Sequence, residues 1–133
     1  MILVDTDVLI AHLRGLEPAR TWLLQARRRG PLAISVVTVT ELSGGMRTTE
    51  RRAVWALLAA LRVEPVTDVI ARRAGELMRT YRRSHSGIGL GDCLVAATAQ
   101  VLGADLVTLN TRRFPMFPAL APPFTVDQGD PTA

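Results

Sequence analysis

Short apolar runs alternate along the chain with stretches in which apolar residues recur at helical spacing. The runs at residues 2–4, 32–37 and 106–109 are typical of buried strands. Between residues 70 and 81 the apolar positions follow one face of a helix. Because strand and helix segments repeat in this order, the pattern predicts an α/β fold with a parallel sheet and helices on its faces.

Two weaker segments accompany this pattern. Residues 63–66 form a short strand that Pro65 confines to a sheet edge, and residues 124–126 are a candidate for a last strand. The length of 133 residues suits a single domain, which we place at residues 1–127, with a flexible tail at 128–133. The apolar runs are too short to span a membrane, and no basic stretch precedes one at the N-terminus. We therefore expect no membrane segment and no signal peptide.

The charge balance favours a polyanionic partner. The formal net charge is +4 at pH 7, and all 16 basic side chains are arginines. The planar guanidinium suits phosphate better than an ammonium group does, although a GC-rich genome would also produce an arginine-only composition. The single cysteine, Cys93, excludes an intrachain disulfide and fits a cytoplasmic location.

Polar residues with side-chain oxygens follow the predicted strands. Asp5 comes directly after the first strand, Glu41 lies in the helical segment after the second, and Asn110 follows the strand at 106–109. Asp92 opens a helix of small residues after a glycine-rich loop. Since the functional cleft of an open α/β sheet lies beyond the carboxyl ends of its strands, we expect these side chains to share one cleft.

An oxygen-rich cleft of this kind is suited to a hard cation. Carboxylates that lie within a few ångströms of one another repel unless protons or a cation neutralise them, and Mg²⁺ or Mn²⁺ prefers oxygen ligands. Zinc is excluded because Cys93, His12 and His85 do not pair at a zinc-like spacing.

Each carboxylate also has a purely structural interpretation. Asp5 can cap the helix that begins at Thr6, and Asp92 can be an ordinary N-cap. Thr38 and Glu41 have the Thr-x-x-Glu spacing of a capping box, which requires no catalysis. The functional interpretation rests on the joint placement of the three acids.

Four segments in order resemble the PIN-domain family, and in particular the VapC-type toxins of bacterial toxin–antitoxin pairs. They are Met-Ile-Leu-Val-Asp-Thr-Asp-Val-Leu-Ile at 1–10, Ser-Val-Val-Thr-Val-Thr-Glu-Leu at 35–42, Gly-Asp-Cys-Leu-Val-Ala-Ala-Thr-Ala at 91–99 and Leu-Asn-Thr-Arg-Arg-Phe at 109–114. The resemblance extends from Met1 to about Phe117. Each segment alone is weakly specific, whereas the ordered set is quite specific.

The resemblance implies a parallel sheet of about five strands between helices, a homodimer, and cleavage of RNA that depends on Mg²⁺ or Mn²⁺. It implies a cognate antitoxin whose tail blocks the site. By matching positions, Asp5, Glu41 and Asp92 are the acidic triad that binds the metal and catalyses hydrolysis, and Asn110 is a polar residue beside them. We expect Thr6 and Asp7 to support these acids through hydrogen bonds.

The segment after the last strand departs from the family pattern. Family members often carry a fourth acid there, whereas this chain has Arg112 and Arg113 before the aromatic Phe114. This leaves open whether one or two metal ions take part. The two arginines are candidates to hold flanking phosphates of RNA, and a solvated loop pair is the alternative.

Two other functions remain open from the sequence. Asp5-Thr6-Asp7 offers the D-x-D of a haloacid-dehalogenase-type phosphatase, but the chain has no lysine, and Leu9 stands where Thr or Val is expected. Because the fourth acid is missing, the chain is alternatively a catalytically degenerate module with an RNA-binding or regulatory role.

Overall fold

The computed structural model describes residues 1–126, and the tail predicted at 128–133 lies outside the described residues. Its centre is a parallel sheet with the strand order β3-β2-β1-β4. The strands are β1 (Ile2–Val4), β2 (Leu32–Ser35), β3 (Arg62–Glu64) and β4 (Asp105–Val107). The predicted α/β class and parallel sheet are confirmed.

The sheet has four strands in the described residues where about five were expected. Residues 124–126 are not a strand, because Phe124 packs against an apolar cluster instead of pairing with the sheet. The strand predicted at 63–66 is β3, which ends before Pro65 and lies at the sheet edge as predicted. The strand predicted at 106–109 ends earlier, at Val107.

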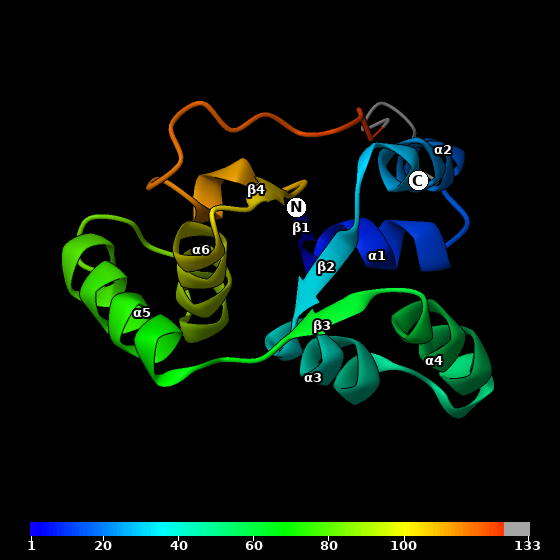
Figure 1. The fold of residues 1–133 in the computed structure, drawn as a ribbon, viewed down its shortest axis with the longest axis horizontal. Helices are drawn as coiled ribbons and strands as arrows, with labels where there is room; N and C mark the ends of the chain where they lie inside the picture. Colours follow the sequence, from blue (N-terminus) through cyan, green and yellow to red (C-terminus); the bar gives the residue numbers. More distant parts are fainter. Residues whose placement is uncertain (127–133) are drawn as a thin grey trace.

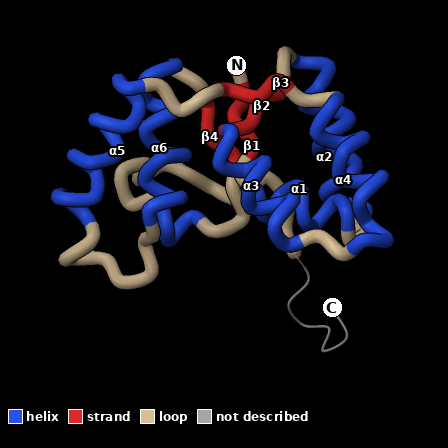
Figure 2. The backbone as a smooth tube through the Cα atoms, turned by 90° about the horizontal axis from the view of Figure 1, so that it is seen from below, coloured by secondary structure: helices blue, strands red, loops and turns tan. Residues whose placement is uncertain are grey.

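Helices cover both faces of the sheet (Figures 1 and 2). Helices α5 and α6 lie side by side on one face, and α1, α2 and α4 lie on the other, with the strands between them. The helices are α1 (Thr6–Leu13), α2 (Glu17–Arg29), α3 (Val36–Gly45), α4 (Arg51–Ala59), α5 (Asp68–Tyr81) and α6 (Leu90–Leu102), with short 3-10 turns η1 (Thr48–Glu50) and η2 (Thr111–Arg113). No helix in residues 1–126 has the length and apolar character needed to cross a membrane.

Helix ends follow the local chemistry of the sequence. Helix α2 carries a proline in its first turn and three arginines in its last, which complement the helix dipole. Helix α6 ends at Gly103, whose φ of +63° is the left-handed conformation that glycine adopts most easily.

Two apolar clusters hold the layers together. One joins α5 and α6 to the sheet face that carries Leu3 and Leu106, with Phe114 fully buried in it. The other joins α1, α2 and α4 to the opposite face, where Val4 and Ile34 lie. Because β1 contributes Leu3 to one cluster and Val4 to the other, it is buried on both sides, as a central parallel strand is.

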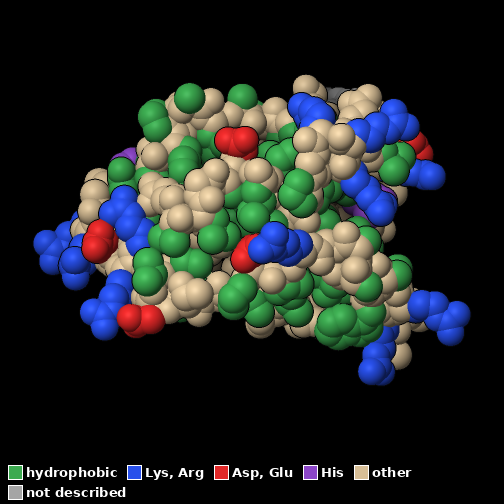
Figure 3. Space-filling view, in the orientation of Figure 1, with side chains coloured by type: hydrophobic (Ala, Val, Ile, Leu, Met, Phe, Trp, Pro, Cys, Tyr) green, Lys and Arg blue, Asp and Glu red, His purple; other side chains and the backbone are tan. Residues whose placement is uncertain are grey.

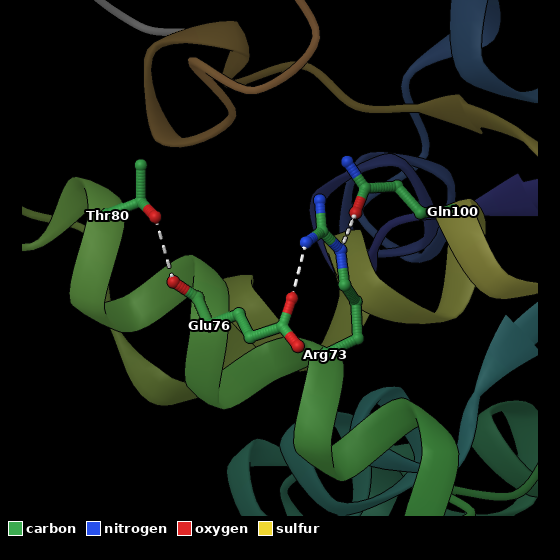
Figure 4. Close-up of polar contacts among 4 residues, drawn as sticks. All are labelled: Arg73, Glu76, Thr80 and Gln100. Carbon is green, nitrogen blue, oxygen red and sulfur yellow. Dashed lines mark hydrogen bonds and ion pairs between the residues drawn. The ribbon is translucent and has the colours of Figure 1, made fainter.

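The α5–α6 pair combines close packing with a polar clamp (Figure 4). Small residues of α6, among them Ala96 and Ala97, are fully buried in the same cluster as α5. At the surface, Arg73 Nε of α5 donates to Gln100 Oε1 of α6 at 2.8 Å, and Arg73 Nη1 lies 2.7 Å from Glu76 Oε2. The clamp fixes α6 beside α5, and α6 carries Asp92 at its N-terminal end.

Candidate active site

The first carboxylate lies at the point where the central strand ends. Asp5 follows β1 and is the N-cap of α1, so its side chain is held between strand and helix. Its Oδ1 accepts a hydrogen bond from Thr6 N at 2.9 Å, and its Oδ2 accepts one from Thr108 Oγ1 at 2.8 Å. The capping interpretation and the placement at the strand end are therefore both correct.

Burial raises the pKa of Asp5 from an ordinary value of 3.8 to about 6. Loss of hydration is the largest cause, and the negative charge of Asp7 is the next. The hydrogen bonds from Thr108 and Thr6 lower this pKa, while the charge of Glu41 raises it. Asp5 is thus a buried acid near other acids, with no cationic side chain among the causes of its shift.

Thr108 joins the first two acids and is a site residue that the sequence analysis did not identify. Its side chain is fully buried, and its Oγ1 lies 2.8 Å from Asp5 Oδ2 and 3.2 Å from Asp7 Oδ2. Asp7 Oδ2 also accepts a hydrogen bond from Leu109 N at 3.1 Å. A hydroxyl residue directly after an apolar strand was the signal that could have found Thr108.

Glu41 reaches the same place from α3 through Thr6. Thr6 Oγ1 donates to Glu41 Oε1 at 2.8 Å and lies 3.0 Å from Thr38 Oγ1. Since Thr6 has one hydroxyl proton and it serves Glu41, Thr38 is the donor in the second contact. The backbone N–H of Thr6 donates to Asp5, so this one residue connects the two carboxylates.

The capping interpretation of Thr38 and Glu41 is wrong. Strand β2 ends at Ser35, and α3 begins at Val36 with Ser35 as its N-cap, whose Oγ accepts from Val37 N at 3.1 Å. The helix therefore starts earlier than the spacing suggested. This puts Thr38 and Glu41 inside the helix, where their side chains are free to bond Thr6.

Asp92 is held by its own helix, the start of which lies against α3. Helix α6 begins at Leu90, so Asp92 is in the first turn and not at the cap, and its Oδ2 accepts from Gly89 N at 2.9 Å. A Cβ added at Gly91 would lie 3.9 Å from Glu41 Oε2, which places the start of α6 against α3. The start of α6 therefore adjoins Glu41, while the Asp92 carboxylate bonds its own helix end.

The oxygen-only donor set fits a hard divalent cation. As the side chains lie, no three acidic, histidine or cysteine residues among residues 1–126 converge closely enough to hold an ion. However, after burial, the negative charges of Asp7 and Glu41 also raise the pKa of Asp5, and a bound cation would offset that part of the shift. Glu41 Oε2 and Asp92 Oδ1 accept no hydrogen bond from the described residues, so each can serve as a ligand oxygen.

The last motif flanks the acids. Asn110 lies three residues after β4, and its backbone N–H donates to Thr108 Oγ1 at 3.1 Å. Arg112 and Arg113 form η2, are exposed and make no ion pair with any residue the structure describes. Phe114 anchors this segment in the core, so both guanidinium groups project from a fixed base.

The chain is similar to known proteins over its whole length. It is 65% identical to Ribonuclease VapC10 of Mycobacterium tuberculosis over 133 residues, which is 100% of both chains. It is 45% identical to Ribonuclease VapC19 of the same organism over 125 residues, 93% of this chain and 100% of that protein.

A solved structure and a family model agree with these relatives. A toxin–antitoxin complex from Klebsiella pneumoniae contains a chain that superposes with a TM-score of 0.77 at 27% identity, covering 95% of this chain and 100% of that one. The model of the PIN domain matches residues 2–119. The chain therefore belongs to the PIN-domain family and, within it, to the VapC group.

Proposed function

We propose that this chain is a metal-dependent ribonuclease that acts as the toxin of a toxin–antitoxin pair. Its similarity to two named ribonucleases and to a chain of a toxin–antitoxin complex supports this function. The observation that carries the chemistry is the link from Asp5 through Thr6 to Glu41 at the carboxyl end of the central strand. The family match gives no support to the phosphatase alternative.

In this proposal Asp5 and Asp92 would hold Mg²⁺ directly and Glu41 would hold it through a water molecule, and Mn²⁺ would substitute. The chemistry that the ion supplies when bound is polarisation of a phosphate oxygen and acidification of a water molecule. Thr6 and Thr108 keep Asp5 in place by donating to its two oxygens. Both carboxylate oxygens of Asp7 share the backbone N–H of Leu109, so in this proposal Asp7 is not a ligand.

The chain's own residues then position and deprotonate the attacking water. Glu41 Oε2, the oxygen that Thr6 leaves free, accepts a proton from the water as its oxygen attacks phosphorus. The bond from phosphorus to the 3′ oxygen breaks, and that oxygen takes a proton from solvent water to become a 3′ hydroxyl, while the phosphate stays on the 5′ end. Glu41 then returns its proton to solvent. Arg112 and Arg113 hold neighbouring phosphates without reading the sequence.

Partners and location complete the proposal. The basic net charge of +4 suits an RNA substrate, and arginines gather mostly toward the outer ends of the face in Figure 3. The solved neighbour is described as a toxin–antitoxin complex, which supports a cognate antitoxin protein. We propose that the chain acts in the cytoplasm as a homodimer.

Cleavage of RNA by the purified chain tests this function. We expect Mg²⁺ to support cleavage of a structured RNA, EDTA to stop it and Asp92→Asn to abolish it. Asp105→Asn is the matched control, because Asp105 is an exposed acid at the opposite end of β4. Equal cleavage by Asp92→Asn and the control would contradict the mechanism. No cleavage by the unaltered chain, together with retained RNA binding, would support the degenerate module instead.

A further inference from the structure

A cavity of about 410 Å³ opens beside Glu41, between the C-terminal half of α1, the end of α3 and the start of α4. Its charged lining residues are Arg14, Glu41, Arg47 and Glu50. This volume is within the range of pocket volumes that bind small molecules, which begins at about 300 Å³. Glu41 is part of its wall, so the cavity borders the residue that Thr6 links to Asp5.

Two arginines of the wall, Arg14 and Arg47, have guanidinium groups that make no ion pair with the residues the structure describes. Arg14 is the C-cap of α1 and Arg47 precedes η1, and both are exposed. Within residues 1–126 the ion pairs involve Arg62, Arg72 and Arg73 only. The wall also carries Glu50, but its Oε1 accepts from the backbone N–H of Arg47 at 2.8 Å and so serves the turn.

The rest of the wall is apolar. Ile10, Leu13, Leu42, Met46 and Val54 all belong to the cluster that packs α1, α3 and α4 over the sheet. A planar base can pack on such a surface, while guanidinium groups bind phosphate oxygens through paired hydrogen bonds. The wall therefore has an apolar surface for the base of a nucleotide and guanidinium groups for its phosphate.

We propose that this cavity binds one nucleotide of the RNA strand next to the cleaved bond, with Arg14 and Arg47 holding its phosphate. The inference rests on the proposed ribonuclease function. A segment of a protein partner is the competing occupant. Two observations favour the nucleotide: Glu41 is shared with the proposed active site, and Arg14 and Arg47 make no ion pair within residues 1–126. A phosphate is the anion that the substrate itself would bring to this place.

Binding of RNA without cleavage tests the site directly. A short fluorescent single-stranded RNA is titrated with the intact chain in EDTA, and the dissociation constant is followed by anisotropy over a range of salt concentrations. We expect Arg14→Gln with Arg47→Gln to weaken binding about tenfold at low salt. The slope of log K against log salt should fall by about 0.7 for each lost phosphate contact. In Mg²⁺ the same variant should raise KM more than it lowers kcat.

Two further variants keep the test specific. Arg28→Gln with Arg29→Gln removes the same charge from exposed arginines at the end of α2, away from the cavity, and should leave the salt slope nearer to that of the unaltered chain. Arg14→Lys with Arg47→Lys keeps the charge and should recover part of the affinity. Circular dichroism melts check that each variant is folded.

The outcomes separate this inference from the proposed function. Suppose that the unaltered chain cuts RNA and that the two glutamine double variants show the same RNA affinity and cleavage rate as each other. The proposed nucleotide site is then wrong, and the ribonuclease function stands. If the Arg14 and Arg47 changes weaken only the complex with an antitoxin, the cavity is a protein site and the inference is overturned. If the unaltered chain does not cut RNA, the proposed function fails by itself, whatever the binding data show.

Discussion

Thr108 donates its hydroxyl to Asp5 across 103 positions of sequence, and the two oxygens lie 2.8 Å apart. The contact joins the segment after β4 to the end of β1, its neighbour in the sheet. The contact also lowers the pKa of Asp5, which burial raises. One hydroxyl therefore helps set both the position and the charge of the most buried carboxylate of the site.

Replacing this hydroxyl should be costly. In Thr108→Val the side chain keeps its shape, but Asp5 Oδ2 loses its donor inside the protein. We expect a loss of about 1–3 kcal/mol in the free energy of unfolding at neutral pH. The pKa of Asp5 should rise above about 6, because the lost bond favoured the charged form. Urea denaturation and carboxyl NMR titration measure the two effects.

Thr98→Val is the matched control for this change. Thr98 is also fully buried, but its hydroxyl donates to Leu94 O within α6 at 2.7 Å. That carbonyl belongs to a helix and keeps its backbone partner when the hydroxyl is removed. We expect a clearly smaller loss of stability and an unchanged pKa of Asp5. Equal losses in the two variants would show that the contact with Asp5 has no special weight.

The stability of the metal-free protein should fall as Asp5 ionises. Its pKa is about 6 in the folded chain against an ordinary 3.8, so the folded state holds the proton more tightly. The stabilisation is fully present below about pH 4 and is lost as pH rises through about 6, a loss of about 3 kcal/mol. In EDTA, Asp5→Asn should therefore be more stable than the unaltered chain at pH 7, by about 1–3 kcal/mol.

The pH profile of this difference is the decisive measurement. Unfolding midpoints of Asp5→Asn and the unaltered chain should diverge as pH rises from about 4 to about 7. Asp105→Asn, at an exposed position, should show no such divergence. If the difference in unfolding midpoint between Asp5→Asn and the unaltered chain did not change over this range, the pKa of Asp5 would not be raised in solution.

Mg²⁺ should reverse this loss by neutralising the carboxylates. A ligand that binds only the folded state adds about 1.4 kcal/mol at ten times its dissociation constant. We expect Mg²⁺ to raise the Tm of the unaltered chain and not that of Asp5→Asn. If the Asp92 carboxylate leaves Gly89 N to bind the ion, Mg²⁺ should also raise the Tm of Asp92→Asn less than that of the unaltered chain. Asp68→Asn, an exposed acid on α5, should keep the full response.

The sheet and its connections could be predicted because they depend on local patterns. Apolar runs marked the central strands, and Pro65 placed β3 at the edge. The ends of these elements depended on competition between neighbouring residues. Ser35 and Thr38 can both cap a helix, and only tertiary contact with Thr6 decides that Thr38 faces inward.

The candidate site could be predicted in part, because the ends of the strands can be located from local patterns. Strand ends located Asp5 and Thr6, but a hydroxyl such as that of Thr108 matters only when β4 pairs with β1. The position of Asp92 in the first turn, where it bonds Gly89, followed from a helix that begins two residues before it. The Thr108 contact joins segments 103 residues apart, so no single stretch of sequence contains it. The Asp92 contact is local, but it depends on the residue at which α6 begins.

The last prediction concerns Thr6, the residue that connects two of the acids. Thr6→Val removes the hydroxyl that donates to Glu41 Oε1 but keeps the backbone bond to Asp5. Loss of such a supporting hydrogen bond typically reduces metal affinity or activity about 10- to 100-fold. We expect the loss to appear in kcat and in the Mg²⁺ concentration for half-maximal rate, and Thr6→Ser to restore most of it. Thr40→Val, on the exposed side of α3, is the control and should cut RNA at the normal rate. If Thr6→Val matched Thr40→Val in rate and in Mg²⁺ dependence, Glu41 would act without help from Thr6.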